Sequence, residues 1–370
     1  MDASVPPPAL AQRLVVRALR HSVAVNACEP LGPWSLARLR LGGAESPSVI
    51  MKWLRDHPAG LRADASQILT EVAALEFLEQ YCPKLAPRLL VADLEARAFL
   101  MEDLAPRRPL LDLLASGDPA GSVGLASFAL TLARLHAATH GHSAAYYERR
   151  ARLGHVDPLW ELRRFFEPLP DVVAIGHRIG APFDSRCQSD LDQLLTELTE
   201  PGPFLAFSNG DSGANNFLVI ESDGRLIDFE FAGFRHCLTD VVCLYVPGSQ
   251  WMTVGDPSLD GAEASYRSAV ASSIPEAEDE RRYGLGIVAA GLAFALMRLG
   301  RLSLLDSRPS GHESRRQMVA TLSAAALLAE RLGVAPALRG WVRRAEVRLR
   351  HRWPDSDVDL SRLAPYSPRV

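Results

Sequence analysis

The first hundred residues alternate short apolar runs with turn residues, a pattern typical of a small sheet. Gly32-Pro33 separates the first two runs and Gly42-Gly43 the next two, as expected for strand connections. We therefore expect five strands: Val23 to Cys28, Leu36 to Leu41, Ser48 to Leu54, Arg88 to Ala92 and Ala98 to Leu104.

One helix is expected between the third and fourth strands, from Ala65 to Gln80. Asp64 followed by Gln67 resembles a capping box, in which two side chains satisfy the free amides of the first turn. Pro83 and Pro87 end this segment. Its apolar side consists of Ile68, Leu69, Val72, Leu75 and Phe77.

Beyond Leu104 the apolar positions recur at helical spacing, first from Val123 to Thr139 and later from Ala262 to Arg350. Proline interrupts the later stretch at positions 275, 309 and 336. One hairpin is expected within this helical part, with Ser222-Asp223-Gly224 joining its strands because Asp-Gly between apolar runs favours a tight turn. Its strands are Phe217 to Ile220 and Arg225 to Phe229.

These patterns predict an α+β protein with two lobes. Residues 1–104 would form a small β-rich lobe, with a five-stranded sheet and one helix. Residues 105–370 would form a large helical lobe with one hairpin.

Composition narrows the function classes. Of the 370 residues, 48% are hydrophobic and 23% are charged, and the net charge of −4 with a pI near 6.2 disfavours nucleic acid as a partner. The longest apolar stretch, Gly286 to Met297, is shorter than the roughly 20 residues of a membrane span and is expected to be a buried helix. Neither a secretory signal nor paired cysteines are apparent, so we expect a cytoplasmic protein without a membrane partner. The oligomeric state stays open.

The chemistry is concentrated between Ser208 and Glu230. Asp211 and Asn216 lie five residues apart in a turn, and the hairpin returns Asp228 to the same place. Phosphoryl transfer needs a carboxylate beside the acceptor hydroxyl and oxygen ligands for magnesium. Asp211 is therefore the candidate catalytic base, and Asn216 and Asp228 are the candidate ligands of Mg2+.

At these residues the chain resembles the aminoglycoside phosphotransferase and choline kinase family, which are relatives of protein kinases. The family's catalytic stretch reads His-Gly-Asp, then Asn five positions on, then a hairpin that ends in Asp-[Phe/Trp]-[Glu/Gly]; here the corresponding segments are 209–216 and 228–230. The resemblance extends over about residues 23–244 and implies ATP as the phosphate donor.

The resemblance also implies roles for residues of the first lobe. Lys52, in Val49-Ile50-Met51-Lys52-Trp53, would contact the nucleotide phosphates, and Glu71, preferred over Glu76, would be its partner. The segment Phe99 to Leu104 looks like the hinge, so the backbone of Met101, Glu102, Asp103 and Leu104 would meet the adenine. Asp240 corresponds to a structural aspartate, and His136 is expected to be a packed core histidine.

Three features depart from the family pattern. Asn209 stands where the family usually has histidine, although an amide can still donate and accept hydrogen bonds. No Gly-x-Gly-x-x-Gly joins the first two strands, which leaves Gly32 and Ser35 as the candidate phosphate contacts. Asp240 follows Asp228 so closely that a peptide-docking activation segment has no room, which favours a small-molecule acceptor.

The acceptor itself stays open between an aminoglycoside, an amino-alcohol and another hydroxylated natural product. By resemblance, its walls would be Tyr146 to Leu198 and the region from Trp251 to Asp260. The acidic run from Glu276 to Glu280 could attract a polycation, but it is more typical of a helix start. An aromatic cage for a quaternary amine could come from Trp160, Phe165, Phe166, Tyr245 and Trp251.

Two other functions remain as alternatives. A catalytically silent module that binds a nucleotide or a partner is suggested by Asn209 and by the poor glycine loop. A magnesium-dependent phosphohydrolase would also use clustered carboxylates, but it needs neither the lysine–glutamate pair nor an adenine hinge.

Overall fold

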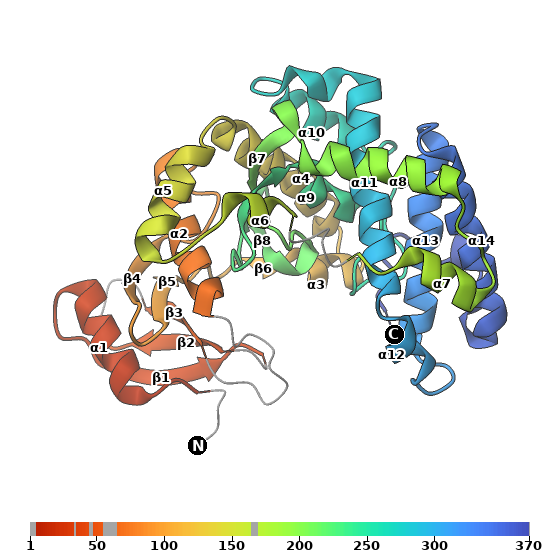
Figure 1. Ribbon diagram of the computed structural model, residues 1–370. Coiled ribbons are helices and arrows are strands. Elements are labelled where there is room, and N and C mark those ends of the chain that lie inside the picture. The colour runs from red at the N-terminus through yellow and green to blue at the C-terminus, as the bar shows by residue number, and fades with distance from the viewer. Residues whose placement is uncertain (1–4, 33–34, 44–46, 55–64, 164–168, 370) are drawn as a thin grey trace.

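The computed structural model describes residues 5–32, 35–43, 47–54, 65–163 and 169–369. Its N-terminal part is an antiparallel sheet of five strands in the order β1-β2-β3-β5-β4 (Figure 1). The expected sheet is therefore formed, and no strand end differs from its expected position by more than two residues. The strands are β1 (Val25–Pro30), β2 (Leu36–Leu41), β3 (Ser48–Trp53), β4 (Leu89–Asp93) and β5 (Ala98–Glu102).

Two helices cover this sheet, one on each face. Since side chains alternate along a strand, Val49 and Met51 of β3 face helix α1 (Pro8–Leu19), whereas Ile50 and Lys52 lie on the face of helix α2 (Ala65–Tyr81). The expectation of a single helix in this region was wrong, because Ala11, Leu14 and Val15 of α1 bury an apolar stripe on the sheet. Asp64 of the expected capping box lies outside the described residues.

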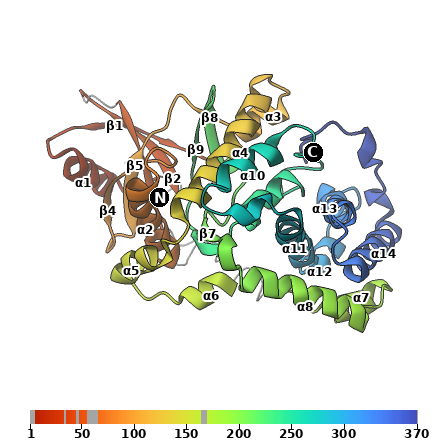
Figure 2. The same ribbon diagram turned by 90° about the horizontal axis from the view of Figure 1, so that it is seen from above.

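The remainder of the chain is mostly helical and surrounds a small β-hairpin region (Figures 1 and 2). The helices expected around residues 123–139 and from residue 262 onward are formed, and breaks fall near Pro275, Pro309 and Pro336. The helices are α3 (Leu110–Ala115), α4 (Ala120–Thr139), α5 (Ser143–Leu153), α6 (Pro158–Arg163), α7 (Val172–Ile179), α8 (Ser185–Thr199), α9 (Leu238–Val241), α10 (Ala262–Val270), α11 (Glu280–Leu299), α12 (Leu302–Asp306), α13 (Glu313–Arg331) and α14 (Pro336–Arg352). The additional strands are β6 (Arg108–Pro109), β7 (Leu205–Ser208), β8 (Phe217–Ile220), β9 (Asp223–Leu226) and β10 (Gly233–His236).

The hairpin β8–β9 differs from the expectation in its register. Ile220 pairs with Asp223, so the turn is Glu221-Ser222 and the Asp-Gly pair belongs to the second strand. Gly224 is required there by packing, because a Cβ atom at this position would lie 1.9 Å from Cζ of Phe217. Tertiary packing against the Phe217 ring therefore overrides the local turn signal.

An aromatic cluster joins α2 to the hairpin region. The ring of Phe77 on α2 lies 5.6 Å from that of Tyr146 on α5, 5.1 Å from Phe207 on β7 and 6.0 Å from Phe234 on β10. Aromatic pairs at these spacings bury large apolar areas in fixed geometry. The cluster consequently fixes the helix that carries Glu71 relative to the strands that flank the catalytic loop.

Helix α11 is the one helix among the described residues that is long and apolar enough to cross a membrane. Most of it is buried, with 72% of its most apolar window inside the protein, and it lies between α8 and α13 (Figure 2). The expectation of a buried core helix is therefore confirmed. The acidic run before it serves the helix start, since the Asp279 carboxylate accepts hydrogen bonds from the amides of Arg281 and Arg282.

Candidate active site

Lys52 lies at the centre of a cluster of three carboxylates. Its Nζ contacts the carboxylate of Glu71, lies 2.5 Å from Oδ1 of Asp228 and lies 3.2 Å from Oε2 of Glu230. Only 9% of the Lys52 side chain is exposed, against 22% for Asp228. The alternative candidate Glu76 is exposed and lies 3.8 Å from Arg149, so the structure supports the choice of Glu71 as the partner of Lys52.

The cluster carries more negative than positive charge. Burial alone would lower the pKa of Lys52, but the neighbouring carboxylates outweigh it and raise that pKa above its usual range. Burial raises the pKa of Glu71 to about 7, because the attraction of Lys52 offsets only part of the desolvation cost. One oxygen from each of Glu71, Asp228 and Glu230 lies within 4.8 Å of the others. Three hard oxygen donors around one ammonium leave a net charge that fits a divalent cation such as Mg2+.

The catalytic loop is anchored by a buried aspartate. Asp240 accepts hydrogen bonds from Oγ of Ser208 at 2.7 Å and from the amide of Asn209 at 2.9 Å, and Nε2 of His136 lies 3.3 Å from it. Burial alone would raise the pKa of Asp240, but these hydrogen bonds and the interaction with His136 lower it below its usual value. His136 is fully buried and its other ring nitrogen contacts the hydroxyl of Tyr266, which confirms its expected place in the core.

Asn209 ties this loop to the end of the hairpin. Its Nδ2 donates to the carbonyl oxygens of Ile227 at 3.1 Å and Asp228 at 3.2 Å, and its Oδ1 accepts from the amide of Asp211 at 3.2 Å. Gly210 follows in a left-handed conformation, where a Cβ atom would lie 2.2 Å from the carbonyl oxygen of Phe231. The Asn-Gly sequence therefore anchors this loop to the end of the hairpin.

The same bonds bring Asp211, Asn216 and Asp228 into one region. Nδ2 of Asn216 lies 2.8 Å from the backbone carbonyl oxygen of Asp211 and 3.2 Å from its Oδ2. The backbone carbonyl of Asn216 accepts a hydrogen bond from the amide of Ile227. Asp228 has a positive φ of 62°, a conformation that is uncommon for residues other than glycine and is concentrated at functional sites. Strand β9 ends just before it, at Leu226.

The remaining predicted nucleotide contacts lie around the edge of the sheet. Met101 and Glu102 end β5, and the carboxylate of Asp103 binds Arg38 at 2.6 Å and Ser48 at 2.6 Å, so its side chain holds the sheet to the connection at Leu104. Gly32 and Ser35 lie in the β1–β2 connection, of which Pro33 and Trp34 fall outside the described residues. Their contacts with a nucleotide stay predictions.

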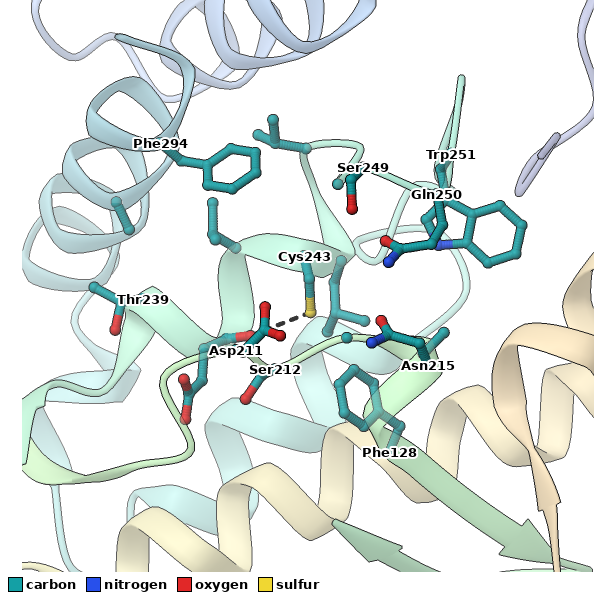
Figure 3. Close-up of a pocket in the computed structure, with 18 of the residues that line it drawn as sticks. Phe128, Asp211, Ser212, Asn215, Thr239, Cys243, Ser249, Gln250, Trp251 and Phe294 are labelled. Atoms are coloured by element: carbon teal, nitrogen blue, oxygen red, sulfur yellow. Dashed lines mark hydrogen bonds between the residues drawn. The ribbon is translucent and has the colours of Figure 1, made fainter. Parts of the chain in front are cut away.

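A cavity of about 320 Å3 opens beside Asp211. Figure 3 shows Asp211 and Ser212 next to Cys243, with Phe294 pointing toward this space from its helix. Its remaining walls are largely apolar and come from α3, α4, the segment after α9, the second half of α11 with the turn after it, and the C-terminal segment. They include Leu110, Leu114, Phe128, Val246, Trp251, Phe294, Arg298, Arg301 and Tyr366.

Comparison with known proteins agrees with this geometry. Residues 29–285, more than half of the chain, match the sequence model of the Phosphotransferase enzyme family. The chain belongs to this family. No curated protein sequence matches this chain.

Solved structures of similar fold include kinases for small molecules. The choline kinase LicA from Streptococcus pneumoniae superposes with a TM-score of 0.50 at 12% identity, over 86% of this chain and 98% of that chain. A choline/ethanolamine kinase family protein from Mesorhizobium loti gives 0.47 at 16% identity, over 86% and 93%. The gentamicin complex of the aminoglycoside phosphotransferase APH(2")-IIa gives 0.48 at 12% identity, over 87% and 96%. Together with the family match, the superposition on LicA shows a kinase-like α+β fold.

The expected acceptor walls of this phosphotransferase need correction. No described residue between Tyr146 and Leu198 lines the cavity, because Tyr146 is fully buried in the aromatic cluster and the helices after it lie elsewhere. Of the proposed cage residues whose side chains the structure describes, Tyr245 and Trp251, only Trp251 lines the cavity. Tyr245 is buried, with its hydroxyl on Glu263 and Tyr283. Phe165 and Phe166 lie outside the described residues.

Sequence reasoning missed two sets of site residues. Glu230 contacts Lys52, and its position directly after Asp228-Phe229 is the signal that could have revealed it. Arg298 and Arg301 line the cavity but lie beyond the residues that match the family model. Their position gave no local signal, since only the packing of α11 brings them near Asp211.

Proposed function

We propose that this family member is an ATP- and Mg2+-dependent phosphotransferase that moves the γ-phosphate to a hydroxyl of a small molecule. The observation that supports this proposal best is that Lys52 contacts both Glu71 and Asp228, so that three distant segments meet. The loop beside them places Asp211 at a cavity. A cytoplasmic location belongs to the same proposal.

In this proposal each lobe contributes one half of the reaction. Lys52, held by Glu71, contacts the phosphates of ATP, and Asp228, Asn216 and Glu230 would hold magnesium. Bound magnesium neutralises charge on the phosphates and orients them for transfer. Glu230 is added to the two ligands that the sequence suggested because its carboxylate lies in one cluster with that of Asp228.

Asp211 acts on the acceptor. Its carboxylate is exposed at the cavity and its orientation is set by the amide of Asn216 and the backbone bond to Asn209. The acceptor oxygen forms a bond to the γ-phosphorus while the bond to the bridging oxygen breaks, and ADP leaves with that electron pair. The hydroxyl proton passes to Asp211, and the lack of space for a peptide-docking segment favours a small acceptor.

The silent-module alternative is weakened by the bonds of Asn209. This residue retains contacts to both Asp228 and Asp211, so its substitution for histidine leaves the loop anchored. A phosphohydrolase would have no use for Glu71 beside Lys52. We therefore propose the active transferase.

The test combines calorimetry with a turnover assay. Purified protein is titrated with ATP and with GTP, with and without magnesium, and ADP release is then measured against a panel of hydroxylated acceptors. D211N should bind the nucleotide like the wild type while its turnover falls by about 10²–10⁴-fold. D192N, an exposed carboxylate on α8, is the matched control. Failure of both nucleotides to bind, or full turnover by D211N, would contradict the proposal.

A further inference from the structure

The acceptor cavity is unusual in its charge. Two carboxylates line it, Asp211 and Asp240, and Asp240 is buried and occupied by the hydrogen bonds of the loop. Arg298 and Arg301 line the same cavity from α11 and its end. A polycationic acceptor would therefore meet one exposed carboxylate, the catalytic one, and three guanidiniums, those of Arg235, Arg298 and Arg301.

Arg298 is a partly buried cation that has no carboxylate partner among the described residues. Its Nη2 donates to Oε1 of Gln317 at 2.6 Å, whereas its buried Nε has no hydrogen-bond partner. Within the described part of the chain, no carboxylate oxygen lies within 4.0 Å of a guanidinium nitrogen of Arg298, the distance expected for an ion pair. Burial, with the nearby charges of Arg301 and Arg369, lowers the pKa of Arg298 to about 10. Such groups are normally paired, because leaving a buried charge uncompensated is costly.

The surroundings of Arg298 direct it toward the cavity. Ala290, Phe294, Arg298 and Arg301 recur at intervals of three or four residues, so they share one face of α11 and its extension. The Arg298 guanidinium lies 5.5 Å from the centre of the Phe294 ring, and Figure 3 shows that ring directed at the space beside Asp211. The helix therefore presents an aromatic surface followed by two guanidiniums.

Size and wall chemistry complete the description of the ligand. A volume of about 320 Å3 is near the lower end of small-molecule sites. Phe128, Trp251 and Phe294 offer aromatic and apolar contact. Building on the proposed function, we propose that the acceptor is a small hydroxylated molecule with an apolar or aromatic body and an anionic group, a carboxylate or a phosphate, that Arg298 and Arg301 bind. A planar guanidinium fork suits either anion.

The test compares matched acceptors in the full-length protein. The probes are 4-(hydroxymethyl)benzoate, 4-(hydroxymethyl)phenylphosphonate, the neutral 4-(hydroxymethyl)benzamide and the cationic 4-(hydroxymethyl)benzylamine. Binding is measured by calorimetry without nucleotide, so that it does not depend on phosphoryl transfer. At least one anion should bind about tenfold or more tightly than the amide, which corresponds to 1.4 kcal/mol. The ratio between the benzoate and the phosphonate tells which anion the site takes.

Variants assign the preference to the arginines. R298Q should remove the difference between the anion and the amide, and R301Q should reduce it. R281Q, at the exposed first turn of the same helix, should leave it intact. Because R298Q also loses a contact with Gln317, circular dichroism melting checks its folding, and R301Q, an exposed residue, decides the question if R298Q is unfolded.

The outcomes separate the two proposals. Anion binding that depends on Arg298 or Arg301 supports the inference even where no probe is phosphorylated and no ATP is bound, in which case the proposed function alone fails. Equal binding of all four probes, tightest binding of the amine, absence of anion binding, or an anion preference that survives both R298Q and R301Q overturns the inference.

Discussion

Nζ of Lys52 lies 2.5 Å from Oδ1 of Asp228, although the two residues are 176 positions apart in the chain. Strand β3 and the end of the catalytic hairpin thus meet at one charged contact between the sheet and the helical part. An ion pair at this position holds the two segments together while leaving a surplus of carboxylates around one ammonium. Four predictions follow from this arrangement and from the loop beside it.

Replacing Asp228 with asparagine should remove the gain in ATP affinity that magnesium gives. The amide keeps the volume of the side chain but lacks the charge that a hard divalent cation prefers. Calorimetric titration of D228N with ATP, with and without magnesium, should give equal affinities, whereas the wild type should differ by about tenfold or more. D223N, on the same hairpin but exposed and paired with Arg107 and Arg225, should behave like the wild type.

The raised pKa of Glu71 predicts a pH dependence of stability. The folded protein binds more protons than the unfolded chain between the ordinary value of 4.5 and about 7, so stability falls as pH rises through this range. The difference of about 2.5 pKa units corresponds to roughly 3 kcal/mol in the free energy of unfolding. Urea unfolding from pH 5 to pH 8 measures this slope.

The variant E71Q isolates the contribution of Glu71. Burial lowers the pKa of His236, so its titration makes the free energy of unfolding rise with pH, opposite to the effect of Glu71. The difference in unfolding free energy between wild type and E71Q removes this contribution and is therefore the informative quantity. That difference should shrink as pH rises. E76Q, an exposed residue of the same helix, should keep the wild-type slope. A wild-type advantage over E71Q that stays constant from pH 5 to pH 8 would show that the carboxylate is charged throughout this range.

Asn209 should be replaceable by histidine but not by alanine. N209A removes two hydrogen bonds to the hairpin end and one to the Asp211 amide, at about 1 kcal/mol each. We expect a loss of about 2–3 kcal/mol in unfolding free energy and at least a tenfold lower kcat. N209H restores a donor and should recover most of the activity. Wild-type kcat in N209A would show that these bonds do not position Asp211.

Gly224 should not tolerate alanine. The added Cβ would collide with the Phe217 ring, and inserting a methyl group into a packed site costs about 1–3 kcal/mol. Chemical denaturation of G224A measures this loss. G340A, a helical position with no atom closer than 3.6 Å to the added methyl group, should be neutral or stabilising by up to about 1 kcal/mol.

The sequence predicted those parts of the molecule that depend on local order along the chain. The strand around Lys52, the helix around Glu71 and the Asp211 loop each have a recognisable pattern, and their order identified the family. Helix α1 was missed because its apolar stripe of Ala11, Leu14 and Val15 follows a proline-rich start and has no side-chain cap. The roles of Asp211, Asn216 and Asp228 stay predictions that the variants above test.

Features that arise from tertiary packing were beyond the reach of such patterns. The hairpin turn was displaced because the Phe217 ring needs the space at Gly224. Of the two expected acceptor walls, residues 146–198 and 251–260, the second contributes Trp251 to the cavity, whereas α11 was not expected there. Neighbours in a cavity come from distant elements, and no spacing rule connects Arg298 with Asp211.

The family match ends at residue 285, and three residues that border the acceptor cavity, Phe294, Arg298 and Arg301, come after it. The two arginines proposed to bind the acceptor therefore lie outside the stretch that defines the family, whereas most of the cavity wall lies within it. Acceptor choice should be open to redesign by exchanging side chains on the second half of one helix, with the phosphate-handling centre left as it is. A library confined to this helical face would sample new substrates without rebuilding the enzyme.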